Sequence, residues 1–161
     1  MEPRIDYRKY TQEVQKHLYG LEEYVAASGL DHRLVLLLKM RASQINGCAY
    51  CIDMHSKDAR ALGETEQRLY ELDAWGETPF YTDRERAALE WVESITRVSE
   101  THVPDEVFEK VKKQFSEKEI VDLTLVAAMI NLWNRIAIPL RAVPGKYQSK
   151  HVPASAVATA S

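Results

Sequence analysis

Apolar residues recur along most of this chain at helical spacing, and turn-forming residues separate the periodic segments. Val14, Leu18, Leu21 and Tyr24 predict the inward stripe of a first helix, which Ser28-Gly29 ends. No segment shows the alternation that is typical of a β-strand. The pattern therefore predicts an all-α fold of about six to seven helices. The predicted segments are 13–27, 33–44, 48–62, 65–74, one from 82 through 95, 104–115 and 116–137.

The predicted helix 33–44 is apolar on nearly every side, because Leu34 through Leu38 and Met40 leave little polar surface. A helix of this kind is buried in a large core or in an oligomer. A single domain of this length has limited interior to cover it. The helix therefore favours a homo-oligomer.

Two capping-box sequences predict where later helices begin. Thr82 is followed three residues later by Glu85, and Ser116 is followed in the same way by Glu119. Asn46-Gly47 breaks the chain before the central helix, which we expect to begin at about Cys48. The expected inward stripe of that helix is Cys48, Cys51, Ile52, His55, Ala59 and Leu62.

The length of 161 residues suits one domain, which we place at 1–148, and the small, aperiodic residues 149–161 predict a flexible tail. A net charge of −3 gives no electrostatic reason to expect nucleic acid or an anionic membrane as partner. No apolar run approaches the roughly 20 residues of a membrane helix. The first residues lack a signal-peptide profile, so we expect a cytoplasmic protein.

The candidate chemistry lies at the start of the central helix. Cys48 and Cys51 are the two cysteines of the chain, and His55 follows four residues after the second. On a helix these three residues fall within an arc of about 60°. The helix amino terminus favours a thiolate, and the imidazole can take a thiol proton directly or through water. Because cytoplasmic thiols are kept reduced, the pair is more typical of redox catalysis than of a structural disulfide.

Two other interpretations remain open. Zinc sites use the same Cys-x-x-Cys spacing, but a structural site needs four ligands and the other histidines are scattered; we expect no bound metal and no cofactor. The two cysteines can also be inert and buried. In the redox interpretation, a peroxide oxidises one thiolate, the second thiol condenses with it, and an external dithiol restores both. The same pair can instead exchange disulfides without meeting a peroxide.

The segment Arg41–His55 closely resembles the motif of the AhpD-like alkyl hydroperoxidases, within the carboxymuconolactone decarboxylase superfamily. Segments 85–89 and 130–135 continue the likeness, which covers roughly residues 15–140. The resemblance implies an all-α enzyme that reduces alkyl hydroperoxides and assembles as a homotrimer or homohexamer. It also implies that Cys51 attacks the peroxide, that Cys48 resolves it, that His55 belongs to a proton relay, and that a lipoylated or thioredoxin-like protein is the reductant.

The sequence departs from this family at two positions. Much of the family has a glutamate twelve residues before the first cysteine, where this chain has Leu36, and some relatives have a histidine where Tyr50 stands. Because His55 then lacks an orienting carboxylate, we expect a weak or altered peroxidase. Candidate substitutes in the relay are Tyr50, Glu93 and Glu119, although Glu119 already has a role in its capping box.

Two rival functions stay open at this stage. One is the lactone decarboxylation that names the superfamily, which needs no cysteine pair. The other is a redox-sensing or interaction module, in which the pair alters contacts between subunits with little turnover.

Overall fold

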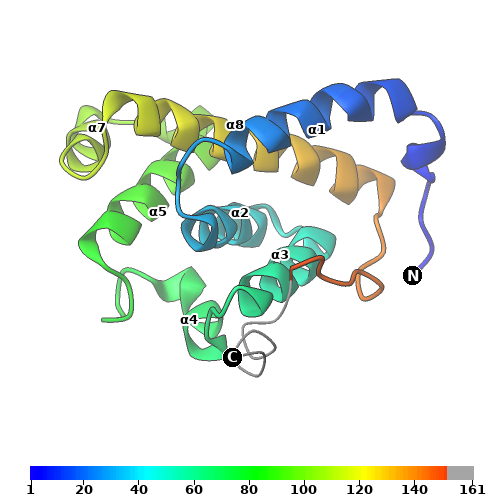
Figure 1. The fold of residues 1–161 in the computed structure, drawn as a ribbon, viewed down its shortest axis with the longest axis horizontal. Coiled ribbons are helices and arrows are strands. Elements are labelled where there is room, and N and C mark those ends of the chain that lie inside the picture. Colours follow the sequence, from blue (N-terminus) through cyan, green and yellow to red (C-terminus); the bar gives the residue numbers. More distant parts are fainter. Residues whose placement is uncertain (152–161) are drawn as a thin grey trace, which may run out of the picture.

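The computed structural model describes residues 1–151, which contain eight α-helices and two short 3₁₀ helices (Figure 1). The all-α prediction is confirmed, with one short helix, α6, that the sequence pattern did not predict. The predicted segment 65–74 divides into α4 and a tighter 3₁₀ turn that buries Leu72. The helices are α1 (Gln12–Ala26), α2 (His32–Asn46), α3 (Ala49–Ala61), α4 (Glu66–Tyr70), α5 (Asp83–Thr96), α6 (Val98–Thr101), α7 (Asp105–Lys112) and α8 (Glu117–Leu140), with 3₁₀ helices at Tyr7–Lys9 and Leu72–Ala74.

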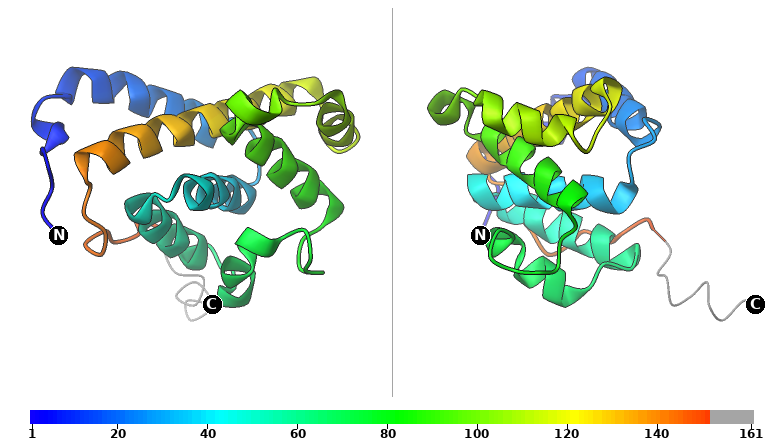
Figure 2. Two further views of the ribbon diagram at one scale, coloured as in Figure 1. Left: turned by 180° about the vertical axis from the view of Figure 1, so that it is seen from behind. Right: turned by 90° about the vertical axis from the view of Figure 1, so that its left-hand side faces the viewer.

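The helices form layers around α2. Helices α1 and α8 lie side by side along one face, α2 lies beneath them, and α3 covers the opposite side of α2 (Figures 1 and 2). Helix α5 packs against both α2 and α8. Most of the predicted tail, 152–161, falls outside the described residues, and 149–151 have no helical structure.

Helix α2 is buried by its own chain. Every residue from Leu34 to Ser43 is buried, including Lys39 and Arg41. The helix is therefore apolar on nearly every side because it lies between α3, α5 and α8. The burial of α2 within one chain removes this helix as an argument for an oligomer, and the homo-oligomer itself stays a prediction.

Helix α1 does not bury the predicted stripe. Val14, Leu21 and Tyr24 are exposed, and Leu18 is half-buried. The helix instead turns Val25 into the core and Glu22 toward α2. The prediction of this stripe was wrong because periodicity defines an apolar face but not the neighbour that covers it.

The predicted helix starts at the two capping boxes are confirmed. The Thr82 hydroxyl accepts a hydrogen bond from the Glu85 amide, and the Ser116 hydroxyl accepts one from the Glu119 amide. In both boxes the glutamate also accepts from the backbone amide of the capping residue. These local bonds satisfy amides that a helix cannot pair internally.

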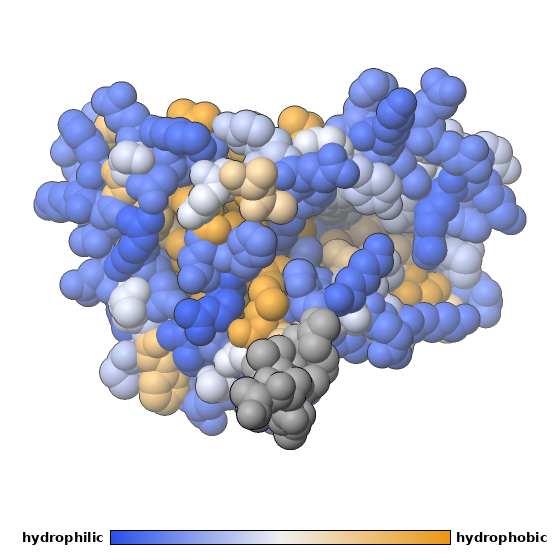
Figure 3. All heavy atoms as spheres, in the orientation of Figure 1, coloured by the Kyte–Doolittle hydropathy of each residue, from blue (hydrophilic) through white to orange (hydrophobic). Residues whose placement is uncertain are grey.

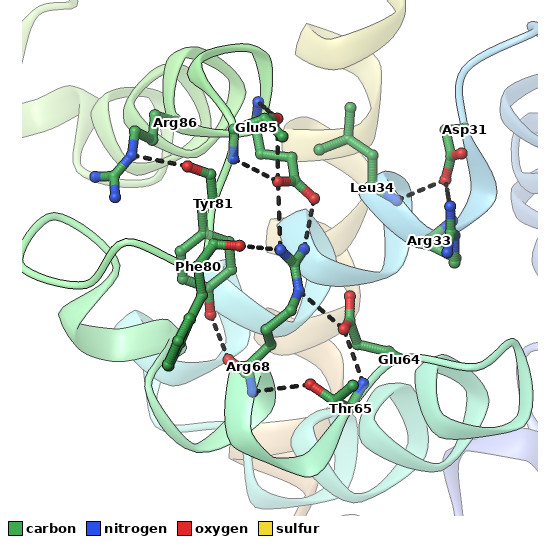
Figure 4. Close-up of polar contacts among 11 residues, drawn as sticks. Asp31, Arg33, Leu34, Glu64, Thr65, Arg68, Phe80, Tyr81, Glu85 and Arg86 are labelled. Atoms are coloured by element: carbon green, nitrogen blue, oxygen red, sulfur yellow. Dashed lines mark hydrogen bonds and ion pairs between the residues drawn. The ribbon is translucent and has the colours of Figure 1, made fainter.

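The connection from α4 to α5 is held by the Arg68 side chain (Figure 4). Its guanidinium donates to Glu64 at 2.9 Å, to Glu85 at 2.5 Å and to the backbone carbonyl of Phe80. It also lies over the Tyr81 ring, 4.7 Å from the ring centroid. This network ties the start of α5 to α4.

By length and composition alone, α8 is apolar enough to cross a membrane. In this fold it packs against α1, α2 and α5 and buries the polar side chains of Asp122 and Asn134 completely. It therefore serves here as a central helix of the helical domain.

Candidate functional site

The cysteine pair sits where α2 turns into α3. Gly47 ends α2 in the left-handed conformation, with φ of 70°, a geometry that suits glycine. This turn makes Cys48 the residue that precedes α3 and places Cys51 in the first helical turn. Both thiols are free and almost fully buried.

The two thiols interact strongly enough to shift each other's pKa. The Cys51 thiol, as donor, is the largest influence that lowers the pKa of Cys48, from 9.0 to about 7. The amides of Tyr50 and Cys51, in the first turn of α3, lower it further. The pKa of Cys51 is raised, first because its proton is shared with Cys48 and then because it is buried. The pair therefore releases its first proton near neutral pH.

His55 lies one turn beyond Cys51 and is buried. Burial, followed by the positive charge of Lys39, lowers the pKa of His55 to about 3. Among residues 1–151 its Nδ1 atom has no hydrogen-bond partner. The imidazole is therefore neutral at physiological pH, and no carboxylate orients it.

Cys51 and His55 share the wall of a cavity of about 310 Å³. The face that holds it is visible in Figure 3, between the α1–α8 layer and α3. Its lining is largely aromatic and apolar, with a few charged groups, and Cys48 does not line it. The lining residues are Tyr7, Tyr19, Glu22, Leu36, Lys39, Tyr50, Cys51, Met54, His55, Asp58, Trp133, Ala137 and His151.

The sulfur that ionises first is not the sulfur that the cavity reaches. The negative charge resides first on Cys48, whereas a molecule in the cavity meets Cys51. Transfer of the Cys51 proton to Cys48 places the thiolate on the cavity side. The assignment of Cys51 as the attacking thiol stays a prediction that agrees with the position of the cavity.

The other predicted site residues separate into two groups. Leu36 and Tyr50 line the cavity, so the position of the missing family glutamate does face the site. Glu93 instead pairs with Arg41 and accepts a hydrogen bond from the Trp75 indole at 2.8 Å. Glu119 caps α8 and pairs with Arg84 at 2.5 Å. The structure brings neither glutamate to the cavity.

The described chain holds no cluster of three or more His, Cys, Asp or Glu side chains suited to a metal ion. The zinc interpretation therefore finds no ligand set in residues 1–151. The chemistry available at the cavity is that of the two thiols and their polar neighbours.

Two polar side chains were not predicted from the sequence to lie beside the sulfurs. Asn134, fully buried on α8, lowers the pKa values of both cysteines through its side-chain amide, and the Ser43 hydroxyl on α2 lowers that of Cys51. Asn134 also donates to the Ser43 hydroxyl at 3.1 Å and accepts from Asn46 at 2.8 Å. An asparagine within the apolar run of α8 was the signal available in the sequence.

Two charged side chains at the cavity were also missed. Lys39 on α2 pairs with Glu22 on α1 at 2.5 Å, and the Trp133 indole donates to the same carboxylate at 2.9 Å. A lysine inside the apolar run 34–40 was the signal, because a buried ammonium group requires a partner. Nothing in the sequence indicated that Glu22 is that partner.

Alkylation of the thiol pair by iodoacetamide should depend on pH with a midpoint near 7. Because the thiolate reacts and the first pKa is lowered to about 7, the rate should rise about tenfold per pH unit below 7 and level off above it. Denatured protein serves as the control, with a midpoint near the ordinary cysteine value of about 8.5. A folded-state midpoint at that ordinary value would contradict the electrostatics of the site.

A model of the carboxymuconolactone decarboxylase family matches residues 12–94, which span both cysteines, His55 and the helices that carry them. The chain belongs to this family. A relative from Bacillus subtilis, the uncharacterized protein YdfG, is 45% identical over 140 residues, covering 87% of this chain and 95% of its own.

Solved structures of the family share the fold. A protein of unknown function from Agrobacterium tumefaciens, whose name relates it to the antioxidant defence protein AhpD, superimposes with a TM-score of 0.87 at 45% identity, covering 91% of this chain and all of its own. The debrominase Bmp8 superimposes with a TM-score of 0.74 at 20% identity, covering 86% and 74% of the two chains, which shows a common fold alone. The AhpD-like fold predicted from the sequence is thereby confirmed, with a peroxidase-related function at the level of the family.

Proposed function

We propose that this protein is a thiol-dependent peroxidase of the AhpD-like type, which reduces alkyl hydroperoxides through a dithiol/disulfide cycle. The observation that carries this proposal is the position of Cys51. This residue lines the cavity together with His55, while the Cys48 thiol, which does not line the cavity, is near enough to raise the pKa of Cys51. A peroxide in the cavity meets one thiol, and the second thiol is already in contact to complete the reaction.

The cycle has three steps. The Cys51 thiolate attacks the terminal oxygen of the hydroperoxide, which forms a sulfenic acid and releases an alcohol once the leaving oxygen has taken up a proton. The Cys48 thiol then condenses with the sulfenic acid, and a disulfide and water result. An external dithiol reduces the disulfide and restores both thiols.

Neutral His55 has a limited part in this cycle. With its pKa lowered to about 3, its imidazole is neutral at neutral pH, and the one N–H that remains on the ring is too weakly acidic to protonate a leaving group. The absence of a carboxylate at Leu36 agrees with this neutral state.

The partners of the proposed enzyme follow from the resemblance. A lipoylated or thioredoxin-like protein supplies the dithiol, and the chain assembles as a homotrimer or homohexamer. A cytoplasmic location suits a pair that must be kept reduced between turnovers.

One equivalent of tert-butyl hydroperoxide should consume both thiols of the reduced protein. The product should be an intramolecular disulfide, seen by intact mass as the loss of two hydrogen atoms, and dihydrolipoamide should restore the thiols and sustain turnover. Protein whose thiols have been alkylated beforehand is the control and should consume no peroxide.

Two experimental results would rule out this proposal. Thiols that survive excess hydroperoxide would contradict a peroxidase. Oxidation to the disulfide without sustained turnover, accompanied by a change in the size of the assembly, would favour a redox-sensing module.

A further inference from the structure

The cavity contains a buried cation whose role the dithiol cycle does not explain. Lys39 is 8% exposed and is the one lysine or arginine among the described residues that line the cavity. Burying an ammonium group is costly unless it is paired and hydrogen-bonded. A chain that only had to fill this space could use an apolar residue, as it does one helical turn earlier at Leu36.

Two helices hold the Lys39 ammonium group in place. Its Nζ donates to Glu22 Oε2 at 2.5 Å, and the second oxygen of that carboxylate accepts from the Trp133 indole at 2.9 Å. The Tyr19 ring stacks against Trp133 with the ring centroids 6.1 Å apart. Glu22, Trp133 and Tyr19 all line the same cavity.

The Lys39 ammonium group has more N–H donors than the described side chains around it accept. It carries three N–H bonds, and Glu22 is the one side-chain acceptor it contacts among residues 1–151. The remaining charged carboxylate of the cavity, Asp58, is occupied by the hydroxyl of Tyr147 at 2.9 Å. An oxygen atom of a molecule bound in the cavity can therefore accept a hydrogen bond from the Lys39 ammonium group.

We propose that Lys39 is a catalytic proton donor, which protonates the leaving oxygen of the hydroperoxide, and that Glu22 and Trp133 are positioning residues for it. This role for Lys39 rests on the proposed peroxidase function. His55 does not compete for it, because its imidazole is neutral at neutral pH and the ring N–H that remains is a far weaker acid than an ammonium group.

The proposed step balances as follows. The Cys51 thiolate forms a bond to the terminal oxygen as the O–O bond breaks, so the sulfur is oxidised to sulfenic acid and the peroxide is reduced. The departing alkoxide takes a proton from Lys39 and leaves as an alcohol. The neutral amine then regains the proton that the thiol pair released on ionisation. The net change is one thiol and one hydroperoxide to one sulfenic acid and one alcohol.

The test compares two oxidants whose leaving groups differ in their need for a proton. An alkoxide from tert-butyl hydroperoxide is a poor leaving group unless it is protonated, whereas peracetic acid releases acetate, which needs no proton. In single-turnover measurements on reduced protein, Lys39→Met should slow the reaction with tert-butyl hydroperoxide about 100-fold and that with peracetic acid less than about 5-fold.

Further variants separate this role from a structural one. The double variant Glu22→Gln/Lys39→Met, which leaves no unpaired charge, should show the same selective loss. Lys39→Arg should recover part of the loss, because a guanidinium group stabilises the leaving oxygen but hardly gives up its proton. Lys110→Met is the matched control, since Lys110 pairs with Glu90 on the surface at 2.7 Å, and it should leave both rates unchanged.

Any other result overturns the assignment of Lys39 as the proton donor. Equal losses with the two oxidants in Lys39→Met and in the double variant would mean that Lys39 only maintains the structure, and no loss in either would mean that another group supplies the proton. Wild-type protein that reacts with neither oxidant would overturn the peroxidase function itself.

Discussion

Cys51→Ser is expected to lower peroxide turnover more than about 1,000-fold, because it removes the sulfur that faces the cavity. Cys48→Ser should also stop turnover, but it should still permit one attack. In that variant the sulfenic acid formed at Cys51 has no thiol to condense with and should accumulate. Dimedone labelling followed by peptide mass spectrometry measures this intermediate, and a coupled assay with dihydrolipoamide measures turnover.

The comparison of the two serine variants decides which sulfur attacks. The lowered pKa of Cys48 offers a thiolate at that position, whereas the cavity reaches Cys51. Sulfenic acid that accumulates at Cys48 in Cys51→Ser, with Cys48→Ser inert to peroxide, would reverse the roles. Serine is close in size to cysteine, so thermal unfolding of both variants should stay close to that of the wild type and serves as the control.

Asn134→Leu is expected to raise the first pKa of the thiol pair above 7 and to lower the free energy of unfolding by about 2 kcal/mol. The Asn134 amide lowers the pKa values of both cysteines, so its loss removes a group that stabilises the thiolate. Ser43 and Asn46 would each lose one buried partner while keeping another. The pH dependence of iodoacetamide alkylation measures the first effect, and urea unfolding followed by tryptophan fluorescence measures the second.

Val121→Ala is a matched control on the same helix, because Val121 is exposed. It should change the free energy of unfolding by less than about 0.5 kcal/mol and leave the thiol pKa unchanged. An Asn134→Leu variant that behaves like this control would show that the asparagine is a packing residue without influence on the thiols.

The local signals in the sequence predicted most of the helices. The Thr82 and Ser116 capping boxes and the Gly47 turn form in the structure as expected, because each depends on residues no more than a few positions apart. The same locality explains why Cys48, Cys51 and His55 were found together. Their common location at the start of α3 is a property of two successive helical turns.

Predictions that required a distant neighbour were less successful. The stripe of α1 was assigned to the wrong side, since apolar periodicity does not identify what a helix packs against. Glu93 was a candidate for the proton relay, but Arg41 and Trp75 hold its carboxylate away from the cavity. Both residues that hold it are distant in sequence, so local spacing carried no information about them.

The sequence by itself determined the helical class, the family resemblance and the position of the thiol pair, because these depend on spacing within single helices. Only the tertiary structure decided which charged and polar side chains lie around the thiol pair. Glu22, Lys39 and Trp133 come from α1, α2 and α8, and they meet at one cavity because those helices pack together. The pKa of a buried group depends on the distances to all its charged and polar neighbours, and these distances exist only once the chain has folded.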